Sequence, residues 1–383
     1  MFGSYVSTRR RSAVVGLVSL VAFVLIHCSQ TQGQTLVIQN QSNQVYSGLQ
    51  IRTTPESGLD CIQIIDSTNI TIENSEIGPC GGNGINIFTN TGSVRQIHMY
   101  DNYIHPETHN NACCDYNDGI FITPGVSDVT IQGNVIAYGE SNVVINGNDG
   151  VDNNSTINRV TVTGNFLLNP RGGDSSRGQN IAAWYATNVL VFQNYALSSR
   201  KGYKYPEIQE DSINFGLGAG FVADHNYVTG GHSASGCGMI ADEAANNVLF
   251  ARNWLVNTGQ CGIGIASGTN QLVDGNRIFN ARPIAGGGNT AIYVWNQYSE
   301  PCGPVTVSHN IGVFRLEDGT YNSFWNGGGC DPATVTNNRW DQAAWDILYP
   351  PSEKMPPPLI PPQPRNCVAR SPYSTQTRWP KCH

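Results

Sequence analysis

Acidic residues gather in one stretch of the sequence, where they could do proton-transfer or metal chemistry. Glu207, Glu210 and Asp211 lie at or before one apolar segment, and Asp242 and Glu243 end the next. Such a cluster can bind Ca²⁺, exchange protons with a substrate, or raise the pKa of one carboxyl group through like-charge repulsion. We expect Asp242, Glu243 and Asp211 to be catalytic and Glu207 and Glu210 to be possible calcium ligands. Capping a turn is the alternative role for each acid alone.

Candidate bases and cations lie close to these acids. His232 stands in GGHSASG, and Lys204 lies in a segment that also carries Arg200 and Lys201. Cleavage of a uronic-acid polymer by β-elimination needs a base that removes the proton at C5 and a cation that neutralises the neighbouring carboxylate. His232 or Lys204 could supply the base, since imidazole titrates near neutral pH. A structural role is the alternative for a lone histidine.

Aromatic residues occupy equivalent positions in repeated segments of the chain. Trp184 and Trp295 share one such position, and between them it is held by Gly216, Asp242 and Ala266. Small side chains between two indoles predict a hollow beside a carboxylate, and aromatic faces stack on the C–H surfaces of sugars. Packing of the indoles beneath long loops is the alternative. A neighbouring column should widen this sugar-binding platform through Phe121, Asn214 and Tyr293.

A second polar cluster lies in the segment HPETHNNACCDYND. Its members are His105, Glu107, His109, Asp115 and Asp118. A His-x-x-x-His spacing aligns two metal ligands on a helix, but the proline after His105 and the flanking strand patterns predict a loop. A surface loop pinned by a disulfide is therefore preferred over a metal site.

An internal repeat must position all of these residues. Short alternating β-branched segments end in asparagine at intervals of 23 to 34 residues. Coils of a parallel solenoid stack about 4.8 Å apart, so these side-chain amides should form a hydrogen-bonded ladder. The asparagines are Asn74, Asn102, Asn134, Asn165, Asn194, Asn226, Asn253, Asn276, Asn310 and Asn338.

A second strand can be aligned in each repeat, from DCIQIIDS at Asp60 to TAIYVWNQ at Thr290. Because side chains alternate along a strand, the apolar third and fifth positions should fill the interior, and the fourth and sixth should point outward. In this register Asp211 and Asp242 differ by five positions along neighbouring strands, roughly 16 Å, which is too far for a direct hydrolytic pair.

Cysteines agree with the same alignment. Cys237 and Cys261 both begin a repeat, and Cys302 and Cys330 lie in matching turns, so each pair should form a disulfide between adjacent coils. Cys367 and Cys382 can close a small loop near the end of the chain. The pairing of four others cannot be deduced: Cys61, Cys80, Cys113 and Cys114.

The repeat resembles the right-handed parallel β-helix of the pectin-lyase-like superfamily from about Leu36 to Trp340, which implies an all-β solenoid of about ten coils. That superfamily includes polysaccharide lyases, glycoside hydrolases, epimerases and non-catalytic surface proteins, so the fold alone does not choose a reaction. The paired-aspartate and His–Gly motifs of polygalacturonases are absent, as is the Arg-x-Pro-x-x-Arg segment of pectate lyases.

The two ends of the chain differ from the repeat. Residues 1–33 have three arginines before a 14-residue apolar run, a pattern typical of a signal peptide and short for a membrane span. The β-helix domain should then cover residues 34–345, and residues 346–383 form a proline-rich tail. Ten cysteines beyond the predicted signal also suit an oxidising compartment, so we expect a secreted protein, extracellular or periplasmic.

Composition limits the possible partners. Charged residues make up 13% of the chain and the net charge is −7, with no basic run after the signal, which argues against nucleic acid as a partner. The sequence predicts a polysaccharide or oligosaccharide ligand and favours a lyase that cleaves a uronic-acid glycan by β-elimination. A glycoside hydrolase is the enzymatic alternative, and a non-catalytic carbohydrate-binding or surface structural protein is the other. Calcium is the one cofactor suggested.

Overall fold

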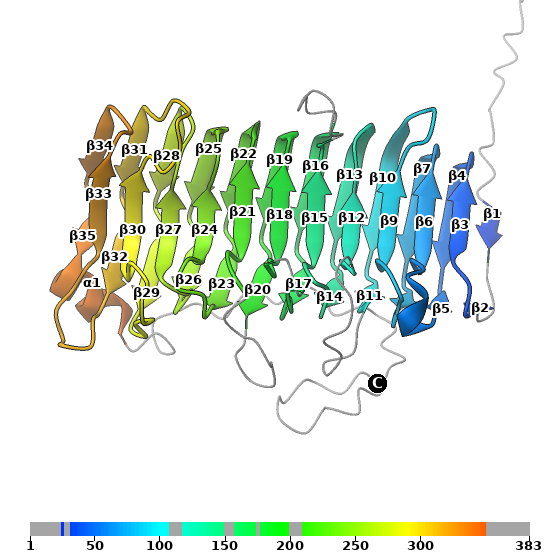
Figure 1. Ribbon diagram of the computed structural model, residues 1–383, viewed down its shortest axis with the longest axis horizontal. Helices are drawn as coiled ribbons and strands as arrows, with labels where there is room; N and C mark the ends of the chain where they lie inside the picture. The colour runs from blue at the N-terminus through cyan, green and yellow to red at the C-terminus, as the bar shows by residue number, and fades with distance from the viewer. Residues whose placement is uncertain are drawn as a thin grey trace, which may run out of the picture.

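The computed structural model describes residues 24–26, 31–106, 117–148, 157–173, 177–198 and 209–349, and it is a parallel β-solenoid. Each coil adds one strand to each of three parallel sheets, as Figure 1 shows along the length of the molecule. The prediction of an all-β solenoid of stacked parallel strands is therefore confirmed. The strand patterns predicted it because alternating residues leave one apolar side that only stacked neighbours can bury.

The three sheets follow one another around every coil. The first sheet contains β1 (Val24–Ile26), β4 (Ser42–Ser47), β7 (Thr68–Glu73), β10 (Val94–Tyr100), β13 (Val126–Gln132), β16 (Ile157–Thr163), β19 (Ala186–Phe192), β22 (Gly218–Asp224), β25 (Ala245–Ala251), β28 (Gln271–Asp274), β31 (Val305–Ser308) and β34 (Ala333–Thr336). The second contains β2 (Thr31–Gln32), β5 (Gln50–Arg52), β8 (Glu76–Ile77), β11 (Tyr103–Ile104), β14 (Val135–Ala137), β17 (Phe166–Leu168), β20 (Tyr195–Ser198), β23 (Tyr227–Gly230), β26 (Trp254–Val256), β29 (Arg277–Asn280), β32 (Ile311–Phe314) and β35 (Arg339–Trp340). The third contains β3 (Leu36–Gln39), β6 (Ile62–Ile65), β9 (Ile85–Phe88), β12 (Ile120–Ile122), β15 (Val143–Asn146), β18 (Ile181–Trp184), β21 (Ile213–Gly216), β24 (Cys237–Ala241), β27 (Cys261–Ile265), β30 (Thr290–Trp295) and β33 (Phe324–Gly328).

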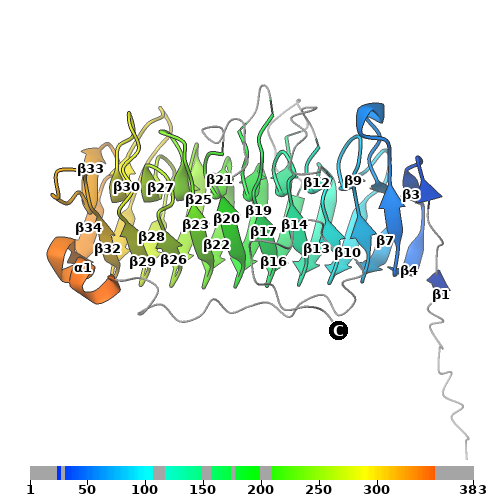
Figure 2. The same cartoon turned by 90° about the horizontal axis from the view of Figure 1, so that it is seen from below.

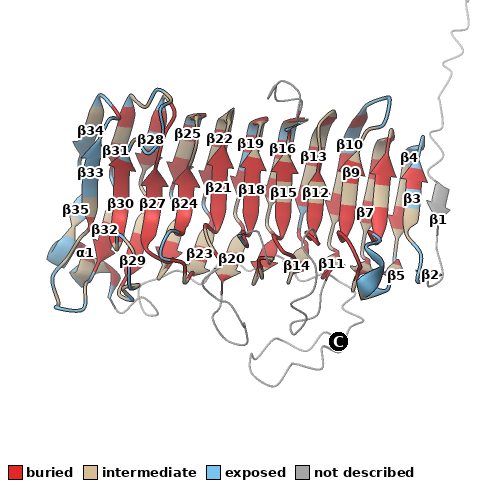
Figure 3. Ribbon diagram, in the orientation of Figure 1, coloured by how far each residue is buried: buried red, intermediate tan, exposed pale blue. Residues whose placement is uncertain are grey.

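The interior is built from columns of identical positions. Ile38, Ile64, Ile87, Ile122 and Ile145 stand directly above one another in the third sheet, each at most 1% exposed. Burial of such side chains is worth about 1.5–3 kcal/mol each, which is the main force that holds one coil on the next. Figure 3 shows the buried strands of this sheet along almost the whole solenoid. The predicted inward positions are therefore confirmed.

The asparagine ladder is present from Asn102 to Asn338. The amide nitrogen of Asn102 donates to Oδ1 of Asn134 at 2.9 Å and to the carbonyl of Ile72 at 2.9 Å, and the pattern repeats in every following coil. The prediction was wrong for Asn74. That residue takes the left-handed backbone conformation that precedes the ladder position, with φ of 51°, and Ser75 donates its N–H to Asn102 instead.

Three disulfides are present among the described residues. Cys237 and Cys261 are bonded with their Cα atoms 4.5 Å apart, and Cys302 and Cys330 with theirs 4.3 Å apart, as the alignment predicted. Cys61 pairs with Cys80, a bond that the sequence left open. The other predicted or undecided cysteines lie outside the described residues: Cys113, Cys114, Cys367 and Cys382.

Helix α1 (Asp341–Leu348) packs against the second sheet near the C-terminal end of the solenoid, as Figure 2 shows from below. Its Ala344 and Leu348 are buried with Phe279 and Val313 of the second sheet. The predicted domain end at residue 345 therefore falls inside this helix. At the other end, the 3₁₀ turn η1 (Pro55–Ser57) leads toward β6. Within the described part of the chain, no helix is both long and apolar enough to cross a membrane.

Candidate functional site

Asp211 belongs to a recurring corner of the solenoid. Its Oδ1 accepts the backbone N–H of Cys237 on the next coil at 2.7 Å, just before strand β21. Asp60 accepts from Asn83 in the same way at 2.8 Å, and Asp118 accepts from Ser141 at 2.8 Å. A carboxylate at this position thus satisfies a backbone donor that the turn would otherwise leave unpaired. Asp211 therefore caps this turn through its Oδ1.

Asp211 shares a side-chain donor with a second carboxylate, that of Asp242. The amide nitrogen of Asn214 donates to Oδ2 of Asp211 at 3.0 Å and to Oδ2 of Asp242 at 3.1 Å. Because both bonds start from one nitrogen, the two carboxylate oxygens lie no more than about 6 Å apart. The predicted separation of roughly 16 Å was wrong, because both side chains lean along the sheet toward Asn214 between them. Asn214 is 1% exposed, and its own Oδ1 makes no hydrogen bond to described residues.

The two carboxyl groups stand in different surroundings. Burial raises the pKa of Asp211 well above its usual value, and the charge of Glu210 adds to this. Asp242 is only half-buried, and its Oδ1 accepts the hydroxyl of Tyr298 at 2.6 Å. Desolvation and the hydrogen bond to Asp242 raise the pKa of Tyr298, so the phenol keeps its proton as a donor. One buried and one half-buried carboxyl group therefore accept hydrogen bonds from a shared amide.

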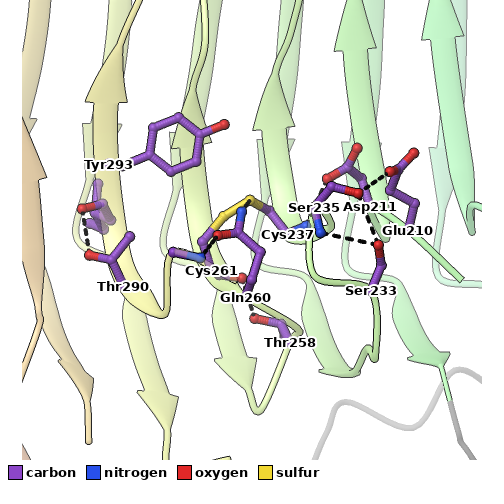
Figure 4. The surroundings of a disulfide bond; sticks show 12 residues. Glu210, Asp211, Ser233, Ser235, Cys237, Thr258, Gln260, Cys261, Thr290 and Tyr293 are labelled. Atoms are coloured by element: carbon purple, nitrogen blue, oxygen red, sulfur yellow. Dashed lines mark hydrogen bonds between the residues drawn. A yellow bond between two sulfur atoms is a disulfide. The ribbon is translucent and has the colours of Figure 1, made fainter. Parts of the chain in front are cut away.

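A disulfide supports this pair from the side. Cys237, whose N–H holds Asp211, is bonded to Cys261 on the next coil. Figure 4 shows the disulfide between Asp211 on one side and Tyr293 on the other. The bond therefore ties β24 to β27 at the edge of the site.

The predicted hollow beside Asp242 is filled by aromatic rings. The indole of Trp184 lies over Gly216, where an added Cβ would be 3.3 Å from the ring. The ring of Tyr293 covers Gly264 in the same manner, within 2.7 Å of the position of such a Cβ. Ala266 is completely buried beside Tyr293. The small residues let large rings lie flat on the sheet, so the expectation of an open hollow at Gly216 and Ala266 was wrong.

Exposed indoles lie toward the C-terminal end of the same face. Trp295 on β30 is 41% exposed and Trp325 on β33 is 44% exposed, and their rings are 5.5 Å apart. Tyr293 lies 6.4 Å from Trp325. Trp295 was expected here, whereas Trp325 and Tyr298 were missed. Alternation in NSFWNG offered a signal for Trp325, but Tyr298 lies in a turn that no repeat predicts.

The remaining predicted site residues are more scattered. Glu243 follows Asp242, and its charge contributes to the raised pKa of Tyr298. His232 lies in the connection before β24, at the opposite end of that strand from Asp242. Phe121 on β12 holds the same strand position as Asn214, three coils before it, as the alignment predicted. Lys204 and Glu207 lie outside the described residues.

The possible calcium ligands are only partly described. The carboxylate of Glu210 accepts the hydroxyl of Ser235 at 2.6 Å and lies 3.9 Å from Nε of Arg177. A guanidinium so close is a poor neighbour for a metal ion, so this residue fits calcium weakly. Among the described ranges, no three His, Cys, Asp or Glu side chains are grouped to hold a metal.

Two members of the second predicted cluster lie among the described residues, His105 and Asp118. His105 stacks on Tyr103 with ring centroids 4.3 Å apart, and its Nε2 lies 3.5 Å from Glu76. Asp118 is buried at the third-sheet corner, where desolvation and the charge of Glu140 raise its pKa to about 7. The other members, Glu107, His109 and Asp115, lie outside the described residues.

Comparison with known proteins gives a likeness of fold alone. No protein-family model and no curated protein matches the sequence. The solved structure of PfbA, a surface adhesin of Streptococcus pneumoniae, matches at 13% identity and a TM-score of 0.42, covering 80% of this chain and 71% of that one. DFA-IIIase from Arthrobacter chlorophenolicus A6, in complex with GF2, matches at 14% identity and a TM-score of 0.47. The match covers 77% of this chain and 83% of that one. A mutant of the periplasmic alginate epimerase AlgG matches at 12% identity and a TM-score of 0.42. The match covers 81% of this chain and 76% of that one.

Proposed function

We propose that this protein binds a polysaccharide along the outer face of its third sheet and hydrolyses it at Asp242. The observation that carries the proposal is the bridge from Asp211 through Asn214 to Asp242, completed by the hydroxyl of Tyr298. Exposed tryptophans on the same face supply the sugar-binding surface that a lone acid pair would lack.

The chemistry follows from the two carboxyl groups. Glycosidic cleavage needs one group that gives a proton to the leaving oxygen and one that is ionised. Burial raises the pKa of Asp211, which favours its protonated form, and Asp242 is oriented by donors on both oxygens. A separation below about 6 Å is that of retaining glycosidases, in which the ionised group attacks the sugar carbon. We assign Asp242 as this nucleophile and Asp211 as the acid.

The aromatic residues would hold sugars on either side of Asp242. Trp184 stands on β18, and Trp295 and Trp325 stand on β30 and β33. From β18 to β33 the sheet advances by five coils, roughly 24 Å at strand spacing, which is long enough for several sugar rings. The glycan would therefore run along the solenoid axis.

Glycan binding without turnover is the second candidate. One observation favours it: Asp211 is 4% exposed and repeats the backbone-capping role of Asp60 and Asp118. In that case Asp211 serves the fold, and Asp242 with Tyr298 forms hydrogen bonds to sugar hydroxyls.

β-Elimination, which the sequence favoured, stays a separate prediction. It would depend on His232 or Lys204 as the base and on a cation near a uronate. A screen of polysaccharides distinguishes the three functions: hydrolysis releases reducing ends alone, elimination adds the ultraviolet absorbance of an unsaturated product, and binding gives neither. Reducing ends without that absorbance would support our proposal, and the absorbance would overturn it.

Calcium dependence at Glu207 and Glu210 remains a prediction with a simple test. Activity or binding on the glycan found by the screen is measured after treatment with a chelator and again after calcium is added back. Loss and recovery would establish a metal requirement, and unchanged function would remove it. The disulfides further suggest export to an oxidising compartment, which fractionation of the producing cells would check.

A further inference from the structure

A mostly apolar hollow lies next to the candidate site, where the third sheet turns into the first. It has a volume of about 320 Å³ and is lined by Tyr185, Leu217 and Ala244, together with Thr187, Ala219 and Asn246. Tyr185 directly follows Trp184, Leu217 follows Gly216, and Ala244 is two residues after Asp242. The hollow is therefore continuous with the surface proposed to bind the glycan.

The residues at this turn have an unfavourable backbone conformation. Tyr185, Leu217 and Ala244 have φ of 52°, 45° and 46°, in the left-handed region that L side chains with a Cβ rarely adopt. They occupy equivalent positions of three successive coils, because the residues after them pair as Thr187 with Ala219 and Gly218 with Ala245.

Other coils use better-suited residues at the same turn. Asn40, Asp66, Gly125 and Gly268 have φ of 54°, 45°, 84° and 91° there, and asparagine, aspartate and glycine tolerate this conformation. The turn itself therefore does not require tyrosine, leucine or alanine. Side chains that the fold alone disfavours, gathered around a hollow, indicate that their surface is used.

The lining defines the kind of group that fits. Leucine and alanine side chains suit a methyl group, and the polar groups of Asn246 and Thr187 are already occupied by hydrogen bonds within the protein. The hydroxyl of Tyr185 makes no hydrogen bond to described residues and can donate one to a ligand. A small apolar group with one carbonyl acceptor matches this surface.

We infer that the hollow binds an O-acetyl group carried by a sugar next to Asp242, so that the protein prefers acetylated polysaccharides. This inference rests on the proposed function, since it names the substrate of the same site. The methyl group would contact Leu217 and Ala244, and the carbonyl oxygen would accept from Tyr185. No covalent step on the acetyl group is involved.

The test compares one polysaccharide before and after removal of its acetyl esters with mild alkali. Wild-type kcat/KM should be about tenfold higher on the acetylated form, the usual scale for a small apolar group in a pocket. Leu217→Gly should remove this preference while its unfolding temperature stays at or above that of the wild type, because glycine accepts the left-handed conformation. Tyr185→Phe should raise KM on the acetylated form only.

Asn40→Gly is the matched control, since it makes the same replacement at the same turn far from the site. It should leave the preference unchanged. Equal wild-type rates on the two forms, or a preference that survives Leu217→Gly, would overturn the inference and leave the proposed function standing. A wild-type protein that neither cleaves nor binds any form would overturn both.

Discussion

The corners at Asp60 and Asp211 are built alike, but only the corner at Asp211 shares a donor with a second carboxylate. At Asp60 the carboxylate accepts from Gln63 and Asn86 at 2.9 Å each, and from the backbone of Asn83. All of these donors are neutral amides. At Asp211 the amide three residues later, Asn214, is shared with a second carboxylate.

The difference shows how a repeated fold acquires a local site. The backbone-capping aspartate is a property of the coil, and it recurs wherever the turn needs an acceptor. The corner at Asp211 differs by a second acid on the next coil and by a tyrosine from the connection after β30, and exposed indoles lie on the same face. The predictions below test that contrast.

The largest expected effect is that of Asp242→Asn. Asparagine keeps the shape but cannot attack or hold a charge, so kcat should fall by about 10²–10⁴-fold on the glycan found by screening, with binding largely retained. Asp60→Asn is the control and should leave the rate unchanged. Full activity in a folded Asp242→Asn protein would place the chemistry elsewhere.

The third corner, at Asp118, should show itself in the pH dependence of stability. Its pKa is raised to about 7, so between about pH 4 and 7 the folded protein holds a proton that the unfolded chain releases. The free energy of unfolding should therefore fall as pH rises through this window, by at most about 1.4 kcal/mol per pH unit from this group.

Asp118→Asn keeps an oxygen that can accept from Ser141 but cannot titrate. Denaturant unfolding of this variant should show a flatter pH profile than the wild type over the same window. An unchanged profile would mean that Asp118 is ionised in the folded protein.

Asp60→Ala and Asp211→Ala should destabilise the protein to a similar extent. Each leaves a buried backbone N–H without its acceptor, at a cost of about 1–3 kcal/mol in the free energy of unfolding. Both losses can be measured by chemical denaturation. Only Asp211→Ala should also lower activity, and equal activity in the two variants would favour the binding-only function.

The smallest effect should come from the sugar platform. Trp295→Ala removes an exposed ring and should weaken glycan binding by about 1–2 kcal/mol without loss of stability. Trp254→Ala, on the second sheet, is the matched control for loss of an indole. Calorimetric titration with the glycan would compare the affinities of the two variants. Equal affinities would exclude the Trp295 face as the binding surface.

The fold could be predicted because it repeats. Inward columns such as Ile64 and Ile87, the ladder from Asn102 onward and the disulfide between Cys237 and Cys261 all depend only on equivalent positions in successive coils. One error arose within the repeat itself: Asn74 takes the left-handed position before the ladder, where asparagine is equally well suited.

The site could be predicted only in part, because it depends on departures from the repeat. Strand register placed Asp211 and Asp242 far apart, since it describes Cα positions and not the direction in which side chains lean. Tyr298 was missed because it lies in the connection between β30 and β31, outside the aligned strands. The predicted hollow beside Asp242 is absent because an aromatic ring from a neighbouring coil packs on each small residue, as Trp184 does on Gly216.

The asparagine ladder gives the chain a direction of assembly. The backbone N–H and side-chain amide of Asn102 find their acceptor on Asn134, which the ribosome makes later. Each coil is thus incomplete until its successor has been synthesised, and a growing chain always ends in a coil with unmet donors. The donors of successive coils therefore find their acceptors in the order in which the coils are translated. The last of these donors, on Asn310, bond to Asn338 close to helix α1.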